Sequence, residues 1–441
     1  MSTSTPASWG QLPKATHFCH PVHHRLAPLP SVESSMLPYG LGRSYGDSCL
    51  NDGENLLLTR GLDHWIAFDP ESGILQCEAG VSLAEILEKV SPMGWFLSVT
   101  PGTRFVTVGG AIANDVHGKN HHKAGCFSTC VLDFELLRSD ETRQLCSRSE
   151  NQERFHATIG GLGLTGLITR ATLQLKRIVS PLIASEQVRM RHLGDFFALA
   201  DETHDTHEYC VAWLDGLASG TSLGSGIFIR GNHLEEPTDL TWKKKPMLPV
   251  PCNAPSWFLR KPFIKAFNYA YSHKLRGDRH QGREHFLPFF YPLDVADRWN
   301  RFYGKKGFFQ YQCVVPRVGD GGPIREILEH ISQSGQASFL NVLKVFGDLP
   351  PEGLLSFPRP GVTLAMDFPN RGPETLALMT RLDEIVMASG GALYPAKDAR
   401  MRGEDFRTFT PNLDQFIPHI DPAFSSSFWR RMERGHSCPS G

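Results

Sequence analysis

The chain has 441 residues, which is more than one hydrophobic core usually supports, so its length predicts two or three domains. Hydrophobic residues make up 41% of the chain and charged residues 21%, which is typical of a globular protein. The formal net charge is -1, far from the strongly basic character of nucleic-acid-binding domains, so we expect no nucleic-acid partner.

The N-terminal residues, MSTSTPASWGQLPKATHF, contain no apolar core that could serve as a secretion signal. No run of about 18 apolar residues suggests a membrane span. We therefore expect a cytoplasmic protein, with peripheral contact at the inner face of the membrane as an alternative. The ten cysteines are scattered singly without a CxxC pair, which favours free thiols in a reducing compartment.

Two clusters resemble metal sites, one near the N-terminus and one at Cys126 and Cys130. Neither has a second group of ligands at zinc-finger spacing, so the sequence predicts no metal site. His117 and His121 are four residues apart, but Gly118 between them argues against the regular helix that would align them. The N-terminal cluster consists of His17, Cys19, His20, His23 and His24.

Residues 1–180 alternate glycine-rich turns with short strand-like runs, and we expect them to begin the first domain. Residues 73–80 are typical of a strand. Ser82 and Glu85 then form a capping box, in which each side chain satisfies an unpaired amide at the start of a helix. Residues 167–178 alternate apolar and polar side chains, as a half-buried strand does.

Residues 181–390 have a different sequence pattern, with longer helix-like and strand-like segments and more aromatic side chains. We expect strands at 307–316 and 362–369 and a helix at 323–335. This mixture predicts a second, α+β domain in which helices cover one side of a sheet. Residues 391–441 carry short polar motifs that make little sense as an independent unit, so we expect them to return to the first domain.

An insert at residues 241–279 carries nine Lys or Arg and one acid, Asp278, with aromatic residues interleaved. Its prolines forbid a long helix across the first half. Composition alone favours a solvated basic loop. The alternative is attachment to an anionic lipid surface or to a lipid-phosphate substrate, because such attachments combine basic and aromatic residues. The basic residues are Lys243, Lys244, Lys245, Arg260, Lys261, Lys265, Lys274, Arg276 and Arg279.

The stretch GGLGLTG at 160–166 contains a GxGxxG pattern. A dinucleotide-binding unit of the Rossmann type needs this pattern between a strand and a helix, with an acid about 20 residues later. Here a strand pattern follows and no acid lies at that distance, so the dinucleotide interpretation is weak. The glycines still indicate a sharp turn or a close approach of the backbone to another group.

Two further glycine-rich stretches favour a phosphate-containing cofactor. The first, PYGLGRSYGDS at 38–48, can expose successive amides in the concave arrangement that suits a pyrophosphate. The second, PGTRFVTVGGAIANDVHGKNHH at 101–122, adds histidines and a lysine to paired glycines. We interpret 101–122 as a segment that lies along a flavin.

The chain resembles the flavoprotein oxidases of the vanillyl-alcohol oxidase superfamily. It is most similar to the branch that oxidises polyprenyl-phosphoryl ribose, over about residues 37–432. The resemblance implies an α+β fold with a bipartite FAD-binding domain, 1–180 and 391–441, and an inserted substrate domain, 181–390, of antiparallel sheet covered by helices. The motifs that carry it are GLGRSYGD, PGTRFVTVGGAIANDVHGKNHH, ATIGGLGLTG, FFQYQCVVP, SFLNVLKVFG, MDFP, LYPAKDAR and DPAFSS.

The cofactor implied by the resemblance is FAD, and we expect it to be bound non-covalently. Tyr45 stands where relatives that attach FAD covalently have a histidine, and the second attachment position carries no cysteine. The positions implied to hold the cofactor are Tyr39, Gly40, Leu41, Gly42, Arg43, Ser44, Tyr45, Gly46, Asp47, Ser48, Gly102, Thr107, Val108, Gly109, Gly110, Asn114, Asp115, Val116, His117, Ile168 and Tyr394.

The resemblance also implies which residues act on the substrate. Lys397 in LYPAKD is the first choice for a catalytic role, either as the base that takes the hydroxyl proton or as a group that orients the substrate. His117 is the second choice, at the flavin or as the base. Lys119 and Lys344 are candidates for the substrate phosphate. Gln310 and Gln312, which alternate on an expected strand, are candidates for sugar hydroxyls.

The function implied is FAD-dependent oxidation of the 2-hydroxyl of a polyprenyl-phosphoryl-β-D-ribose to the 2-keto sugar. The implied partners are this lipid-linked sugar phosphate and a separate NAD(P)H-dependent keto-sugar reductase, which completes an epimerisation to the arabinose form. Two alternatives stay open: a soluble sugar or aldonolactone oxidase that uses oxygen, and a flavin-fold binding protein whose chemistry has lapsed. Ala365 stands where the resembling mycobacterial enzymes carry a cysteine.

Overall fold

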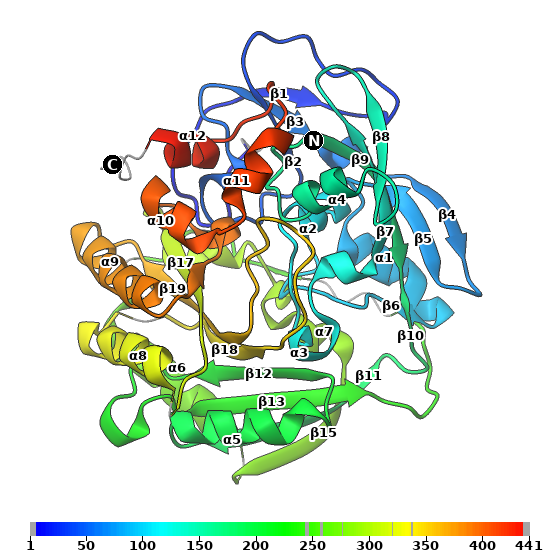
Figure 1. The fold of residues 1–441 in the computed structure, drawn as a ribbon. Coiled ribbons are helices and arrows are strands. Elements are labelled where there is room, and N and C mark those ends of the chain that lie inside the picture. The colour runs from blue at the N-terminus through cyan, green and yellow to red at the C-terminus, as the bar shows by residue number, and fades with distance from the viewer. Residues whose placement is uncertain are drawn as a thin grey trace.

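The computed structural model describes residues 6–242, 247–255, 259–275, 277–319, 321–336 and 338–434. Helices and strands are mixed along the chain, which agrees with the α+β prediction (Figure 1). Two antiparallel sheets dominate the described residues, one of five strands in the first part of the chain and one of eight strands in the rest. The division into domains at 180 and 390 stays a prediction.

The five-stranded sheet has the order β4-β5-β9-β7-β8. The predicted strands at 73–80 and 167–178 are confirmed as β5 and β9, and the second is shorter than expected because β10 pairs with β6 instead. The predicted capping box is also confirmed: Ser82 and Glu85 exchange hydrogen bonds at the start of helix α1, Leu83–Val90. The strands are β4 Trp65–Asp69, β5 Ile74–Glu78, β6 Trp95–Phe96, β7 Val131–Leu137, β8 Arg143–Ser147, β9 Leu167–Gln174 and β10 Lys176–Arg177.

The eight-stranded sheet has the order β15-β11-β13-β12-β18-β19-β17-β20. The strands expected at 307–316 and 362–369 are its neighbouring strands β17 and β19. The strands are β11 Leu182–Met190, β12 Tyr209–Leu214, β13 Gly226–His233, β15 Arg279–His285, β17 Phe308–Val315, β18 Asn341–Phe346, β19 Gly361–Pro369 and β20 Ala392–Leu393.

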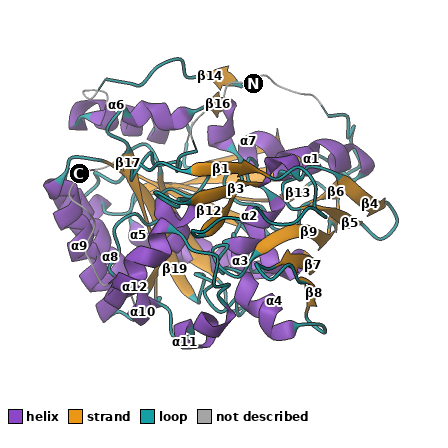
Figure 2. Ribbon diagram, turned by 90° about the horizontal axis from the view of Figure 1, so that it is seen from above, coloured by secondary structure: helices purple, strands orange, loops and turns teal. Residues whose placement is uncertain are grey.

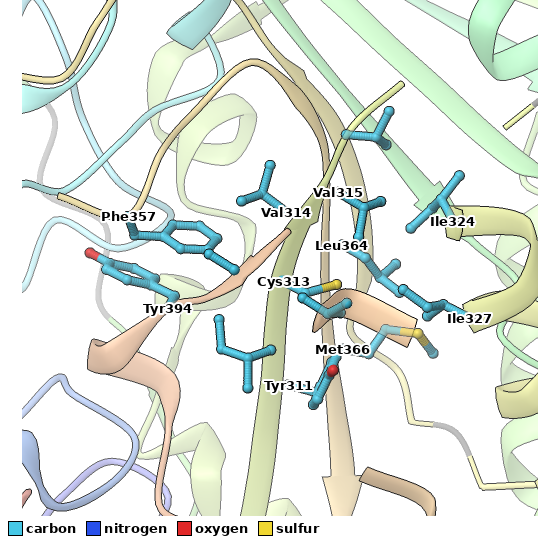
Figure 3. Close-up of a cluster of buried hydrophobic side chains, with 14 of the residues drawn as sticks. Tyr311, Cys313, Val314, Val315, Ile324, Ile327, Phe357, Leu364, Met366 and Tyr394 are labelled. Carbon is cyan, nitrogen blue, oxygen red and sulfur yellow. The ribbon is translucent and has the colours of Figure 1, made fainter. Parts of the chain in front are cut away.

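One face of this sheet is apolar and carries helices. The helix expected at 323–335 is α8, Gly322–Ser334, which packs beside α5, Leu193–His204, and α9, Pro373–Ala388, in one continuous core (Figure 1). Because successive side chains of a strand point to opposite faces, every second residue of β17 and β19 enters this core. Figure 3 labels several residues of this core: Tyr311, Cys313, Val315, Leu364 and Met366 of the sheet, and Ile324 and Ile327 of α8.

The tail leaves the sheet and returns to the first part of the chain. Phe424 forms a bridge with Met36 of strand β2, so the tail lies against the small parallel sheet β1-β3-β2. This sheet and the tail helices are close together in Figure 1. The elements are β1 Phe18–Pro21, β2 Met36–Tyr39, β3 Asn55–Leu58, α10 Gly403–Phe409, α11 Leu413–Phe416 and α12 Ser427–Arg434.

The insert at 241–279 is described in part. Lys243, Lys244, Lys245 and Arg276 lie outside the described residues. The described first half contains the short strand β14, Leu248–Pro249, which pairs with β16, Ala296–Asp297, and helix α6, Lys261–Ser272, follows. Figure 2 shows these elements at one edge of the molecule. Nowhere in the described residues is a helix long and apolar enough to cross a membrane.

Buried ion pairs hold the tail on the first loop. The Arg431 guanidinium, 9% exposed, donates to Asp47 at 2.7 and 2.9 Å and to Asp398 at 2.9 Å. Both carboxylates are buried, so the guanidinium offsets two negative charges that the interior would otherwise disfavour. These charges raise the pKa of Arg431 further above its ordinary value.

Replacing Arg431 with Met should lower the free energy of unfolding by about 3–5 kcal/mol, because it leaves buried carboxylates without a partner. Urea unfolding followed by circular dichroism measures this. The matched control is Arg381→Met, which removes a half-exposed arginine paired with Glu384 and should cost less than about 1 kcal/mol. Equal losses in the two variants would contradict the role given to Arg431.

Candidate active site

A cavity of about 330 Å³ lies between the first part of the chain and the eight-stranded sheet. Its volume is within the range of pockets that bury small molecules and cofactors. The loop at 38–48 and residues 100–119, which include helix α2, Val108–Ala113, form one wall, and strands β17, β18 and β19 form the other. The end of the tail, through Tyr394, Ala396 and Lys397, completes it.

The loop at 38–48 lines the cavity with donors that have no protein acceptor. The Oγ of Ser48 and the Nε of Arg43 are buried without a hydrogen-bond partner in the part of the chain that the structure describes. Buried polar atoms are nearly always satisfied, so these two donors fit a ligand that brings acceptors, such as the diphosphate of FAD. Burial also lowers the pKa of Arg43, which an anion would counteract.

Glycines bring the backbone close to this space. Gly102 lines the cavity, and a Cβ added to it would meet no protein atom within 4 Å, so the space beside its backbone is open. Gly163 has a φ of +78° and Gly166 one of +138°, and both also line it. The pattern GGLGLTG therefore lies at the cofactor cavity although it does not open a helix, and the close approach that its glycines indicated is observed.

Three neighbouring strands supply the opposite wall. Gln312 is opposite Ala365, and Lys344 is opposite Thr363, in the antiparallel register of β17, β19 and β18. All four line the cavity, because they lie on the face of the sheet that is opposite to the helices. Gln310, two residues before Gln312, faces the same way, and both glutamines are buried.

The tail places Lys397 over the first loop. Its Nζ lies 3.9 Å from the centroid of the Tyr45 ring, at a distance where the ring stabilises a positive charge. Burial lowers the pKa of Lys397 to about 7, and the carboxylate of Asp367 acts in the opposite direction. An amine with this pKa is partly neutral near pH 7 and can accept a proton.

Tyr394 anchors the same segment of the tail. Its hydroxyl donates to the carbonyl of Asn114 at 2.8 Å, and its ring stacks on that of Phe357 with ring centroids 4.7 Å apart. Figure 3 shows these two rings side by side. This contact ties the tail to residues 101–122, which form part of the wall across the cavity.

His117 joins two predicted substrate residues. Its Nδ1 lies 3.0 Å from the Nζ of Lys344, and its Nε2 lies 2.9 Å from the Nε2 of Gln312. Burial, and then the positive charge of Lys344, hold the pKa of His117 well below its ordinary value, so the imidazole is neutral. Both ring nitrogens are therefore engaged by protein groups.

Two further lysines add positive charge to the cavity. Burial lowers the pKa of Lys344 to about 7, and the charge of Lys119 lowers it further. Burial likewise lowers the pKa of Lys119 to about 8, and its ammonium donates to the carbonyl of Phe289 at 2.6 Å. An anion bound between these groups would restore their ordinary pKa, so the cavity favours a negatively charged ligand.

Asp367 lies behind this site and was missed from the sequence. It is fully buried on β19 and accepts hydrogen bonds from Gln310 at 2.7 Å and from the Tyr303 hydroxyl at 2.8 Å. Burial raises its pKa to about 7, while the same hydrogen bonds and the charge of Lys397 favour the ionised form. No pattern in MDFP separates such a residue from a surface aspartate.

Five of the predicted cofactor residues do not line the cavity. Asp47 pairs with Arg431, and Asp115 accepts hydrogen bonds from the amide of Ser128 and the hydroxyl of Ser356. These carboxylates hold the loops together and do not face the cofactor space. The five are Tyr39, Gly46, Asp47, Val108 and Asp115.

The other predicted residues do line the cavity, together with several that the sequence did not single out. Of the latter, Trp9 has no sequence signal at all, because it reaches the site through a hydrogen bond of its amide to the Ser44 carbonyl. Residues in this group include Trp9, Thr100, Leu162, Leu293, Trp299 and Thr363. The predicted residues that line the cavity are Gly40, Leu41, Gly42, Arg43, Ser44, Tyr45, Ser48, Gly102, Thr107, Gly109, Gly110, Asn114, Val116, His117, Lys119, Ile168, Gln310, Gln312, Lys344, Tyr394 and Lys397.

Comparison with known proteins agrees with this geometry. Residues 31–147 match a family model described as an FAD binding domain. Decaprenylphosphoryl-beta-D-ribose oxidase of Mycolicibacterium smegmatis is 34% identical over 409 residues, which cover 89% of this chain and 88% of that protein. An uncharacterized protein of Streptomyces coelicolor is 34% identical over 371 residues, or 80% of this chain and 100% of that one. L-gulonolactone oxidase of Mus musculus is 31% identical over 135 residues, which cover 31% of this chain and 30% of its own length.

Replacing Ser48 with Ala should weaken FAD binding about tenfold, because one hydrogen bond to a charged group is lost without loss of packing. Titration of flavin-depleted protein with FAD, followed by quenching of flavin fluorescence, measures the change. The exposed Ser149, replaced with Ala, should leave the affinity unchanged. Unaltered affinity in the Ser48 variant would remove this loop from the cofactor site.

Proposed function

The chain belongs to the family of FAD-linked oxidases that includes decaprenylphosphoryl-beta-D-ribose oxidase, and from this premise we propose that it oxidises the 2-hydroxyl of a polyprenyl-phosphoryl-β-D-ribose to a ketone. It is an FAD-dependent oxidoreductase. One observation supports the choice of substrate: two buried glutamine amides and three lysine ammonium groups line the same cavity as the loop at 38–48.

The cofactor is held without a covalent bond. Tyr45, whose ring lies beneath Lys397, offers no imidazole nitrogen for attachment. The residues proposed to hold the diphosphate are Arg43 and Ser48, which have unsatisfied donors. When bound, FAD supplies the hydride acceptor.

Lys397 takes the proton of the sugar hydroxyl. It is mostly buried, its pKa is lowered to about 7, and the Tyr45 ring stabilises the ammonium that forms. His117 is a poorer base, because its two nitrogens already contact Lys344 and Gln312. We assign His117 the role of holding these two side chains in place.

The substrate is oriented at both ends. Gln310 and Gln312 bind sugar hydroxyls, since both are buried and lie on one face of β17. Lys119 and Lys344 bind the phosphate, where a negative charge would be stabilised by two poorly solvated ammonium groups. A keto sugar formed in this way requires a separate reductase, which we propose to be NAD(P)H-dependent, to give the arabinose form.

The lipid part of such a substrate requires contact with a membrane, and we propose that the protein works peripherally at its inner face. The basic and aromatic insert supports this assignment.

The test is anaerobic mixing of the FAD-loaded enzyme with a short-chain prenylphosphoryl ribose. We expect the visible flavin absorbance to bleach within the turnover time, and free ribose or an aldonolactone to leave it unchanged. Bleaching by the free sugar or lactone, with hydrogen peroxide released in air, would instead establish a soluble sugar oxidase. Absence of bleaching with every substrate would indicate a binding protein.

Replacing Asp367 with Asn should shift the pH dependence of kcat/KM. The carboxylate raises the pKa of Lys397, so its removal lowers that pKa. If the neutral amine is the base, activity rises with pH through this pKa, and the rising limb should move to lower pH by about one unit.

The control is Asp383→Asn, which removes another buried carboxylate, paired with Arg400 on the helix side of the sheet. This variant should lower the free energy of unfolding without shifting the rising limb of the pH profile of kcat/KM. A wild-type profile that falls through the same pH range would show that Lys397 acts as an ammonium that orients the substrate.

A further inference from the structure

Exposed apolar side chains gather on one part of the surface. Six of the fifteen most exposed large hydrophobic residues in the described ranges lie between 247 and 295. They lie in or directly before β14, in helix α6, and at the end of the 3-10 helix that precedes β16. We call this the insert surface; its apolar members are Met247, Leu248, Phe263, Phe267, Tyr269 and Val295.

The insert surface is one connected feature. Leu248 pairs with Ala296, the residue that follows Val295, so these two exposed side chains come from adjacent strand segments. Helix α6 buries Ile264 in the same cluster that contains Ala296 and Leu293. Figure 2 shows α6, β14 and β16 along one edge of the molecule, outside the large sheets.

Positive charge is concentrated in residues 247–275 of this surface, whereas Asp297 of β16 is paired with Arg298. Residues 247–275 contain four Lys or Arg and no Asp or Glu, in a chain whose net charge is -1. All four cations are exposed, and Lys265 and Lys274 lie on or beside α6 among its aromatic side chains. Exposed aromatic and aliphatic groups surrounded by cations suit the surface of an anionic bilayer. The apolar groups can enter the boundary between headgroups and acyl chains, and the cations can pair with the anionic headgroups.

The insert surface also adjoins the active-site cavity. Leu293 and Trp299 line the cavity and belong to the cluster that the buried side of α6 enters. Val295, which is 60% exposed, is two residues from Leu293. The wall of the cavity and the cluster that supports α6 therefore share side chains.

We propose that the insert surface docks the protein on an anionic phospholipid membrane and presents the cavity to its lipid-linked substrate there. The inference rests on the proposed function for its purpose, although vesicle binding can be measured independently. The apolar side chains enter the headgroup region, and the four cations pair with lipid phosphates. Because the cations contribute to this contact by electrostatic attraction, it should weaken as salt is added.

The experiment is sedimentation of the FAD-loaded protein with vesicles of phosphatidylcholine alone or of phosphatidylcholine mixed with phosphatidylglycerol. We expect binding to the mixed vesicles, weakened by salt, and little binding to phosphatidylcholine. Lys265→Gln with Lys274→Gln should lower the partition coefficient about thirtyfold, or about fivefold for each lysine. The control pair is Lys14→Gln with Lys123→Gln, both exposed elsewhere, and it should bind as the wild type does.

A second variant tests the apolar part. This variant replaces three side chains of the insert surface with Ser: Leu248, Tyr269 and Val295, which are 60–67% exposed. The control variant replaces three residues on other parts of the surface with Ser: Phe18, Leu26 and Val318, which are 55–64% exposed. The first should lose vesicle binding and keep its flavin absorbance and thermal midpoint. The proposal is overturned if the wild-type protein does not bind the mixed vesicles, or if the insert variant and the control variant bind them equally.

The proposed function is assessed separately in the same samples. Reduction of the flavin by a soluble short-chain prenylphosphoryl ribose should be unchanged in both insert variants, whereas a long-chain substrate in vesicles should react only when the protein binds. Loss of vesicle binding with intact short-chain activity supports the docking surface. Vesicle binding without activity on either substrate would contradict the proposed oxidase function but would still support the docking surface.

Discussion

The alternation of side chains along β17, β18 and β19 is the constraint on which this structure depends. Residues at one parity pack against helices α5, α8 and α9, so the sheet is fixed in register by its hydrophobic core. Residues at the other parity are then obliged to face the first part of the chain. A shift of one residue would bury Gln312 and Lys344 among aliphatic side chains, so the core that stabilises the sheet also positions the active site.

Desolvation of charged side chains is the second constraint on the active site. Lys119, Lys344 and Lys397 lie in one cavity, and burial lowers the pKa of each to between about 7 and about 8. Positive charges held in this way are costly to the free protein and become favourable when a phosphate arrives. Asp367 is the counterpart, a buried carboxylate that limits how far the pKa of Lys397 falls.

The cofactor wall has a different origin. It consists of glycine-rich loops and the short helix α2, Val108–Ala113, and these segments need external support. Arg431 supplies it by pairing with Asp47 and Asp398, and Tyr394 supplies it through the carbonyl of Asn114. The site is therefore complete only when the last part of the chain has returned to the first.

Local patterns in the sequence determined the capping box at Ser82, the strands β5, β9, β17 and β19, helix α8, and the glycine-rich loops, because each depends on residues close together in the chain. Family motifs located the cavity-lining lysines and glutamines. Only the tertiary structure revealed Asp367, Trp9 and the engagement of His117 on both nitrogens, since these depend on partners far away in sequence. It also separated Asp47 and Asp115 from the cofactor wall. A motif identifies a loop, but the direction of each side chain is decided by what the rest of the fold packs against it.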